Sequence, residues 1–133
     1  MDFDRPVALI MHAVLDFLPD HTNPYGIVSR LLEPLAPGSY LSLTHCTSDF
    51  APEAWGAVID TYERRGIQAQ ARTKTEVLRF FRGLELVDPG LVVAHRWRPE
   101  PASGPSLVTD TQVSMYAGLA RRSAGRERAG MGA

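Results

Sequence analysis

The stretch RPVALIMHAVLDFLPD, from Arg5 to Asp20, decides the fold. Its centre, Val7–Leu15, is almost continuously apolar, and His12 is the polar interruption before the chain turns polar at Asp16. A short apolar run that is bounded by a proline and by the turn-rich DFLPDHTNPYG is typical of a strand covered on both faces. Because such strands belong to parallel sheets, the stretch predicts an α/β domain.

Helix and strand patterns alternate after this first strand. Asn23 and Pro24 form a helix cap and first turn, and apolar residues then recur at helical spacing as far as Leu35. A strand over Ser39–Cys46 and a helix over Pro52–Arg65 follow. Strand, helix and strand in this order predict a right-handed parallel crossover.

The remaining part of the chain is expected to complete the same sheet. Thr73 and Glu76 form a capping-box pattern that opens a short helix. Three strand candidates follow it: Leu84–Val87, Leu91–Ala94 and a last strand that begins at Gln112. We expect one partial domain over residues 1–122 and a disordered tail over 123–133, because RRSAGRERAG has no apolar periodicity.

Composition narrows the class of protein. The chain has 133 residues, of which 44% are hydrophobic, and this suits one globular core. A net charge of −1 with scattered basic residues argues against a binder of nucleic acid or anionic membranes. No apolar run approaches the ~20 residues of a membrane span. The lone Cys46 excludes an internal disulfide and fits a reducing compartment, so we expect a cytoplasmic protein.

Polar residues follow the two expected parallel strands, at the edge where α/β sheets bind ligands. His45 and Asp49 are the candidates for proton transfer, although each also has an ordinary structural explanation. A hydrolase or isomerase that uses this pair ranks last among the hypotheses, since no nucleophile lies in a recognisable turn. We expect no metal site, because no histidine or cysteine group has ligand spacing. A glycine-rich nucleotide turn is also missing from the sequence.

Four phrases, taken in order, resemble a known family: VLDFLPD, LAPGSYL, FFRGLELVDPGLV and HRWRPE. They are similar to the C-terminal half of a bacterial class I S-adenosylmethionine-dependent methyltransferase family that was formerly a domain of unknown function. The resemblance runs from Phe3 to Arg122. It implies strands four to seven of a Rossmann-like fold, which form a four-stranded mixed sheet with flanking helices. The last strand would run antiparallel between strands five and six.

The resemblance also implies a cofactor and site residues. S-adenosylmethionine would lie near Asp16, Phe17 and Leu18, although Asp16 stands where the family usually has histidine. The segment from His45 to Asp49 would face the methyl acceptor. Because the glycine-rich cofactor half is absent from these residues, we expect a truncated protein with little activity alone.

An alternative hypothesis is a non-catalytic assembly module. In it, the exposed edge of Val7–Leu15 pairs with a second copy of the chain or with a separate N-terminal half.

Overall fold

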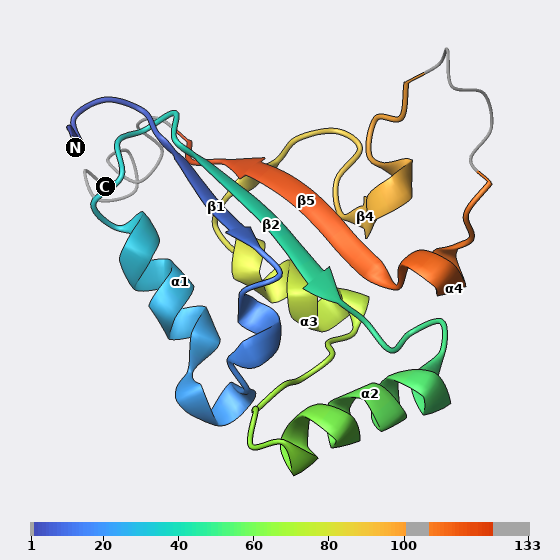
Figure 1. The fold of residues 1–133 in the computed structure, drawn as a ribbon. Helices are drawn as coiled ribbons and strands as arrows, with labels where there is room; N and C mark the ends of the chain where they lie inside the picture. Colours follow the sequence, from blue (N-terminus) through green and yellow to red (C-terminus); the bar gives the residue numbers. More distant parts are fainter. Residues whose placement is uncertain (1, 101–106, 124–133) are drawn as a thin grey trace.

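The computed structural model describes residues 2–100 and 107–123 and shows a mixed sheet with helices beside it (Figure 1). The expected Rossmann-like α/β class is confirmed. The strands are β1 (Ala8–His12), β2 (Tyr40–Cys46), β3 (Glu85–Leu86), β4 (Val92–Val93) and β5 (Met115–Arg121). The helices are α1 (Pro24–Leu32), α2 (Pro52–Arg64), α3 (Lys74–Leu78) and α4 (Asp110–Val113), with 3-10 turns at Leu15–Phe17, Asp20–Thr22, Arg79–Phe81 and Ala94–Arg96.

The strand order in the sheet is β1-β2-β5-β3, and β4 also pairs with β5. β1 is parallel to β2, whereas β5 is antiparallel to β2, β3 and β4. The last strand is therefore antiparallel and inserted, as expected. Within residues 2–100 and 107–123 the sheet has five strands rather than the expected four. β3 and β4 lie one after the other along the same edge of β5, since Glu85 pairs with Arg121 and Val92 pairs with Ala117.

All five predicted strands are longer than the observed ones, and the first and last differ most, by three residues at one end. β1 ends at His12 instead of Leu15, because Ala13 has a positive φ of 54° that breaks the extended backbone. The last strand begins at Met115 instead of Gln112. The residues before it form α4, which Thr109 caps by accepting a hydrogen bond from the backbone N–H of Gln112. A threonine three residues before a glutamine is a capping-box pattern, so the sequence contained this signal.

The two faces of the sheet differ in their cover. On one face Met11, Leu41 and Leu43 pack under α1, α3 and the 3-10 turn at Arg79–Phe81. On the other face Ile10 is 62% exposed, and His12 lies in the open, where its Nε2 is 2.7 Å from Ser42 Oγ. The expectation that both faces of the first strand are covered is therefore wrong for the part of the chain that the structure describes.

The covered face is tightly packed at β5. Gly118 lies there beside Phe81, and a Cβ added to it would be 2.9 Å from the Phe81 ring and 3.1 Å from Leu91 Cδ1. Contacts this short displace a side chain or the backbone. The absence of a side chain at Gly118 thus allows Phe81 to reach the sheet.

α2 lies away from this core, beyond the carboxyl end of β2 (Figure 1). None of its residues is buried, although Trp55, Val58, Ile59 and Tyr62 recur at helical spacing as predicted. Its end is closed by two backbone hydrogen bonds of 2.9 Å, from Gly66 N–H to Glu63 C=O and from Ile67 N–H to Tyr62 C=O. Gly66 has a φ of 78°, which completes a Schellman cap.

Within the described ranges, no helix is both long enough and apolar enough to cross a membrane. The cytoplasmic location expected from the lone Cys46 stays a prediction. Of the expected tail, only Ser123 falls among the described residues, and 124–133 lie outside them.

Candidate active site

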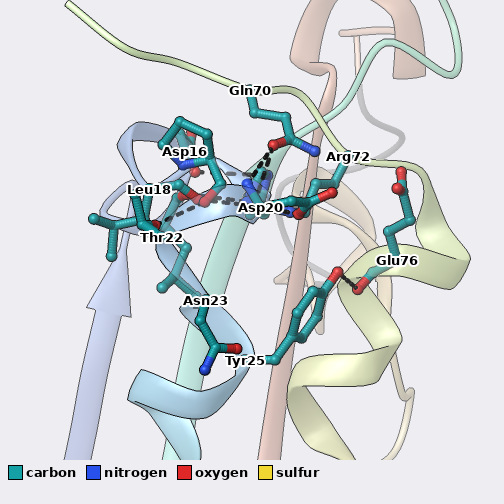
Figure 2. A network of polar contacts seen from close by, with 12 residues as sticks. Asp16, Leu18, Asp20, Thr22, Asn23, Tyr25, Gln70, Arg72 and Glu76 are labelled. Atoms are coloured by element: carbon teal, nitrogen blue, oxygen red, sulfur yellow. Dashed lines mark hydrogen bonds and ion pairs between the residues drawn. The ribbon is translucent and has the colours of Figure 1, made fainter.

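A buried arginine organises the carboxyl ends of β1 and β2 (Figure 2). The side chain of Arg72 is 0% exposed. Its guanidinium donates to Leu15 C=O at 3.0 Å, to Leu18 C=O at 2.8 Å and to Asp20 Oδ1 at 2.9 Å. These bonds satisfy carbonyls that a turn would otherwise leave without partners. Arg72 therefore fixes the segment that follows β1.

The same guanidinium also holds His45, at the end of β2. Arg72 Nη1 lies 2.7 Å from His45 Nε2. Because arginine can only donate, Nε2 accepts, and the ring proton is on Nδ1, which donates to Cys46 C=O at 2.7 Å. Burial lowers the pKa of His45 and outweighs the nearby Asp16 carboxylate, which raises it. His45 is thus a neutral, buried side chain with both ring nitrogens engaged.

Asp20 forms the outer side of this network. Its side chain is 58% exposed, and hydrogen bonds from Arg72 and Gln70 lower its pKa. The Asp20 backbone N–H donates to Gln70 Oε1 at 2.9 Å. On the inner side the guanidinium carbon lies 5.8 Å from the ring centre of Tyr25 and 5.4 Å from that of Phe80. The cation is therefore held by one carboxylate, by carbonyls and by two aromatic rings.

The predicted cofactor-facing residues occupy the fixed segment. Asp16 Oδ2 accepts a hydrogen bond from Cys46 N–H at 3.3 Å, whereas Oδ1 is buried with no hydrogen-bond partner among the described residues. Phe17 is 41% exposed, and its ring meets that of Tyr62 edge-on at 5.6 Å. Leu18 packs against the core. The segment after β1 is thus in contact with α2.

The structure does not join His45 and Asp49 by a hydrogen bond or an ion pair. Asp49 Oδ2 instead accepts from Tyr116 O–H at 2.7 Å and from Lys74 N–H at 3.0 Å. Burial and the bond to Asp49 raise the pKa of Tyr116. In this geometry Asp49 links the start of α3 to β5, and His45 links β2 to Arg72.

Asp16, His45 and Cys46 place potential metal-ligand atoms within 4.8 Å of one another. Their chemistry is unsuited to a metal ion. Nδ1 of His45 is a hydrogen-bond donor, and the Arg72 cation lies against the other ring nitrogen. Burial raises the pKa of the Cys46 thiol to about 12, so the sulfur is neutral. In this structure these residues form a hydrogen-bonded network with Arg72.

A cavity of about 840 Å³ lies between α2 and the segment 66–71. Trp55 and Ile59 of α2 form part of its wall, and Ile67 comes from the returning segment. Pro19 and His21, at the end of the segment fixed by Arg72, also line it. The cavity therefore borders the same segment that the sequence assigns to the cofactor.

Two parts of this site could not be found from the sequence. Arg72 stands between Ala71 and the capping residue Thr73, where an arginine is ordinarily solvent-exposed, and no pattern indicates its burial. Helical spacing predicts the apolar stripe of α2, but it does not tell whether that stripe packs on a sheet or lines a cavity.

The model of the S-adenosyl methyltransferase family matches residues 1–123. The chain belongs to this family. A crystal structure of a DUF574 family protein from Streptomyces avermitilis is 43% identical, with a TM-score of 0.86 over 92% of this chain. A putative methyltransferase from Thermobifida fusca is 30% identical, with a TM-score of 0.81 over 93% of this chain. A comparison with curated proteins gave no match.

This methyltransferase-family protein covers only part of the length of these relatives. It spans 46% of the Streptomyces protein and 46% of the Thermobifida protein. A SAM-dependent methyltransferase from Methanosarcina mazei shares the fold alone, at 16% identity and a TM-score of 0.59, and the chain covers 61% of it. The family resemblance drawn from the sequence phrases is therefore confirmed.

Proposed function

We propose that this chain takes part in methyl transfer from S-adenosylmethionine to a small acceptor. S-adenosylmethionine would be held by the segment Asp16–Leu18 and would supply an electrophilic methyl group to the acceptor there. Such a reaction depends mainly on holding the two reactants in line. The chain's own contribution is therefore the positioning of the segment after β1 and of the cavity under α2.

One observation carries the proposal: the segment fixed by Arg72 borders both places where reactants would lie. Asp16 and Phe17 lie at its start, and Pro19 and His21 at its end line the cavity. Asp16 Oδ1 is buried 3.6 Å from His45 Nδ1, whose proton is donated to Cys46 C=O, so this oxygen can accept a further hydrogen bond, as from a polar group of a cofactor. Phe17 adds an exposed aromatic ring at the same edge.

Within this proposal, His45 and Asp49 position the site and do not touch the acceptor. His45 is fully buried against Arg72, and Asp49 is bonded to Tyr116 and to the backbone of Lys74. Ser48, between them, is the member of the 45–49 segment that lines the cavity. The substrate-facing role expected for this segment is thus assigned to Ser48.

We expect the isolated chain to bind cofactor weakly. The glycine-rich turn that grips a nucleotide-type cofactor is not among residues 1–133, and the chain covers 46% of its relatives. Isothermal titration with S-adenosylhomocysteine should therefore show a dissociation constant in the millimolar range. Micromolar affinity would contradict the expected weakness.

The placement of the cofactor is tested by amide NMR of the same titration. Shift changes should concentrate at Asp16, Phe17 and Leu18. Asp16→Asn should reduce them, because it replaces a carboxylate acceptor, whereas Asp60→Asn on the exposed surface of α2 should leave them unchanged. An absence of shifts at these three residues at millimolar ligand would sink the proposal.

A second candidate function is assembly through β1, with a separate N-terminal half of a methyltransferase fold as the partner. β1 is an edge strand of the described sheet, and Tyr40 N–H donates to Val7 C=O at 2.9 Å. Since strand backbone groups alternate in direction, the N–H of Ile10 points away from β2. This edge and the exposed Ile10 side chain support the proposal.

Size-exclusion chromatography with light scattering tests this second candidate. A mixture of the chain with an N-terminal half from a family member should form a one-to-one complex. Ile10→Pro should abolish it by removing the outward N–H, while Ile10→Thr should retain it. If this chain stays monomeric in the mixture, the proposal is contradicted. If this chain forms a homodimer, the partner at β1 is a second copy of the chain and not an N-terminal half.

A further inference from the structure

α2 carries an apolar stripe that the core does not use. Trp55 and Ile59 are half-buried, and no residue of the helix is fully buried. These two side chains, one turn apart, line the cavity of about 840 Å³ together with Ile67 from the returning segment. An indole and two isoleucines along a cavity of this size form a surface suited to the apolar body of a small molecule.

The stripe continues into a carboxylate. Trp55, Ile59 and Glu63 recur every four residues, so they follow one another on one side of α2 at steps of about 6 Å. Among the described residues that line the cavity, Glu63 is the one that carries a full charge at neutral pH. Arg64 and Arg65, which follow it, do not line the cavity.

The Glu63 side chain is exposed and is not paired with a cation of the described residues. It lies in the last turn of α2, where the helix dipole disfavours a negative charge. No ion pair in the described ranges 2–100 and 107–123 includes Glu63. A cation bound in the cavity could therefore pair with this carboxylate.

We propose that this cavity binds a small amine with a compact apolar or aromatic body, and that this amine is the methyl acceptor. The ammonium group lies by Glu63, and the apolar body lies along Ile59 and Ile67 in the direction of Trp55. The acceptor role rests on the proposed methyl transfer. The binding site itself does not, because it follows from the lining of the cavity alone.

Tyramine and 4-hydroxyphenylacetate are suitable probes, because they share a phenol ring and carry opposite charges. The full 133-residue chain is titrated with each, and the indole N–H signals of Trp55 and Trp97 are followed by NMR, assigned with Trp97→Phe. Tyramine should shift the Trp55 signal and not that of Trp97, which lies in a separate groove. The acid should bind about tenfold more weakly.

Glu63→Gln and Glu53→Gln provide the matched variants. Both replace a glutamate of α2, but only Glu63 lines the cavity. Glu63→Gln should weaken tyramine binding about three- to fivefold and abolish the preference over the acid, while Glu53→Gln should change neither. Circular dichroism checks that both variants stay folded.

The result that overturns the site is an unshifted Trp55 signal at millimolar tyramine, equal binding of the two probes, or an unchanged preference in Glu63→Gln. Titration with S-adenosylhomocysteine separates this failure from that of the proposed function. If tyramine binds with the expected dependence on Glu63 and the cofactor causes no shift at Asp16–Leu18, the amine site stands and methyl transfer falls. If the cofactor causes those shifts and tyramine does not bind, methyl transfer stands and the amine site falls.

Discussion

The local sequence signals of α1 and α2 are similar, but the two helices have different roles. Both begin with a proline in the first turn, and both carry apolar residues at helical spacing. α1 buries Pro24, Val28 and Leu32 against the sheet, whereas α2 buries no residue. The comparison teaches that an amphipathic pattern specifies a helix and its apolar side but not what that side meets.

The difference has a geometric cause. α1 connects two adjacent parallel strands and must return across the sheet, so its apolar side meets the covered face. α2 follows β2 at the carboxyl edge and is tied to the segment after β1 by the contact of Tyr62 with Phe17. After α2 the chain returns to buried positions at Ala69 and Arg72. The following predictions test this contrast between a core helix and a helix that lines a cavity.

The largest expected effect is at Arg72, where the chain returns from α2 to the core. Arg72→Met should lower the free energy of unfolding by about 3–5 kcal/mol, because it leaves buried carbonyls and His45 Nε2 without a donor. Arg79→Met, at an exposed cation 4.3 Å from the Tyr25 ring, should cost less than about 1 kcal/mol. Equal losses in urea denaturation would show that Arg72 is no anchor.

The next effect compares the helices directly. Leu32→Ala in α1 should cost about 2–5 kcal/mol through loss of buried apolar surface and the cavity left behind. Ile59→Ala in α2 should cost less than about 1 kcal/mol, since the side chain borders open space. Denaturation midpoints measure both. A comparable loss for Ile59→Ala would mean that α2 belongs to the core after all.

Two glycines test the same contrast by adding a methyl group instead of removing side-chain atoms. Gly118→Ala should destabilise the protein by about 1–3 kcal/mol, because the new methyl group overlaps the Phe81 ring. Gly56, inside α2, has no atom within 4 Å of an added Cβ. Gly56→Ala should therefore stabilise by about 0.5–1 kcal/mol through helix propensity. Thermal melts of the two variants should shift in opposite directions, and shifts of the same sign contradict the difference in packing.

The smallest effect concerns His45, which lies between the two helices in sequence. Its pKa is lowered in the folded protein, so below about pH 6.5 the unfolded state binds the proton that the native state does not. The free energy of unfolding should therefore fall on acidification from about pH 6.5, by at most about 1.4 kcal/mol per pH unit for this one group.

Urea denaturation between about pH 7.5 and 5.5 measures this slope. His21→Asn, at an exposed histidine, should retain it. A flat profile over this range would show that His45 accepts a proton in the native state.

Much of the fold could be predicted because its signals are local. Thr73 and Glu76 make both hydrogen bonds of the capping box, at 3.2 and 2.9 Å, and Asn23 caps α1. The ends of β1 could not be predicted, because the apolar run continues through Ala13, whose positive φ is set by the turn into the segment that Arg72 holds. The resemblance implies Asp16 to Leu18 as the cofactor-facing segment, and this stays a prediction. Arg72, which holds that segment, could not be found because it lies more than fifty residues away in the chain.

The sequence by itself determined the order of strands and helices, their caps and the family, because each depends on neighbouring residues or on phrases kept in order. Tertiary structure alone decided which apolar stripe became core and which became the wall of a cavity. It also decided that Arg72 is buried and that His45 and Asp49 are held apart in separate networks. Those outcomes depend on contacts between distant segments, and the burial of a charge is stable only where such contacts supply its hydrogen-bond partners.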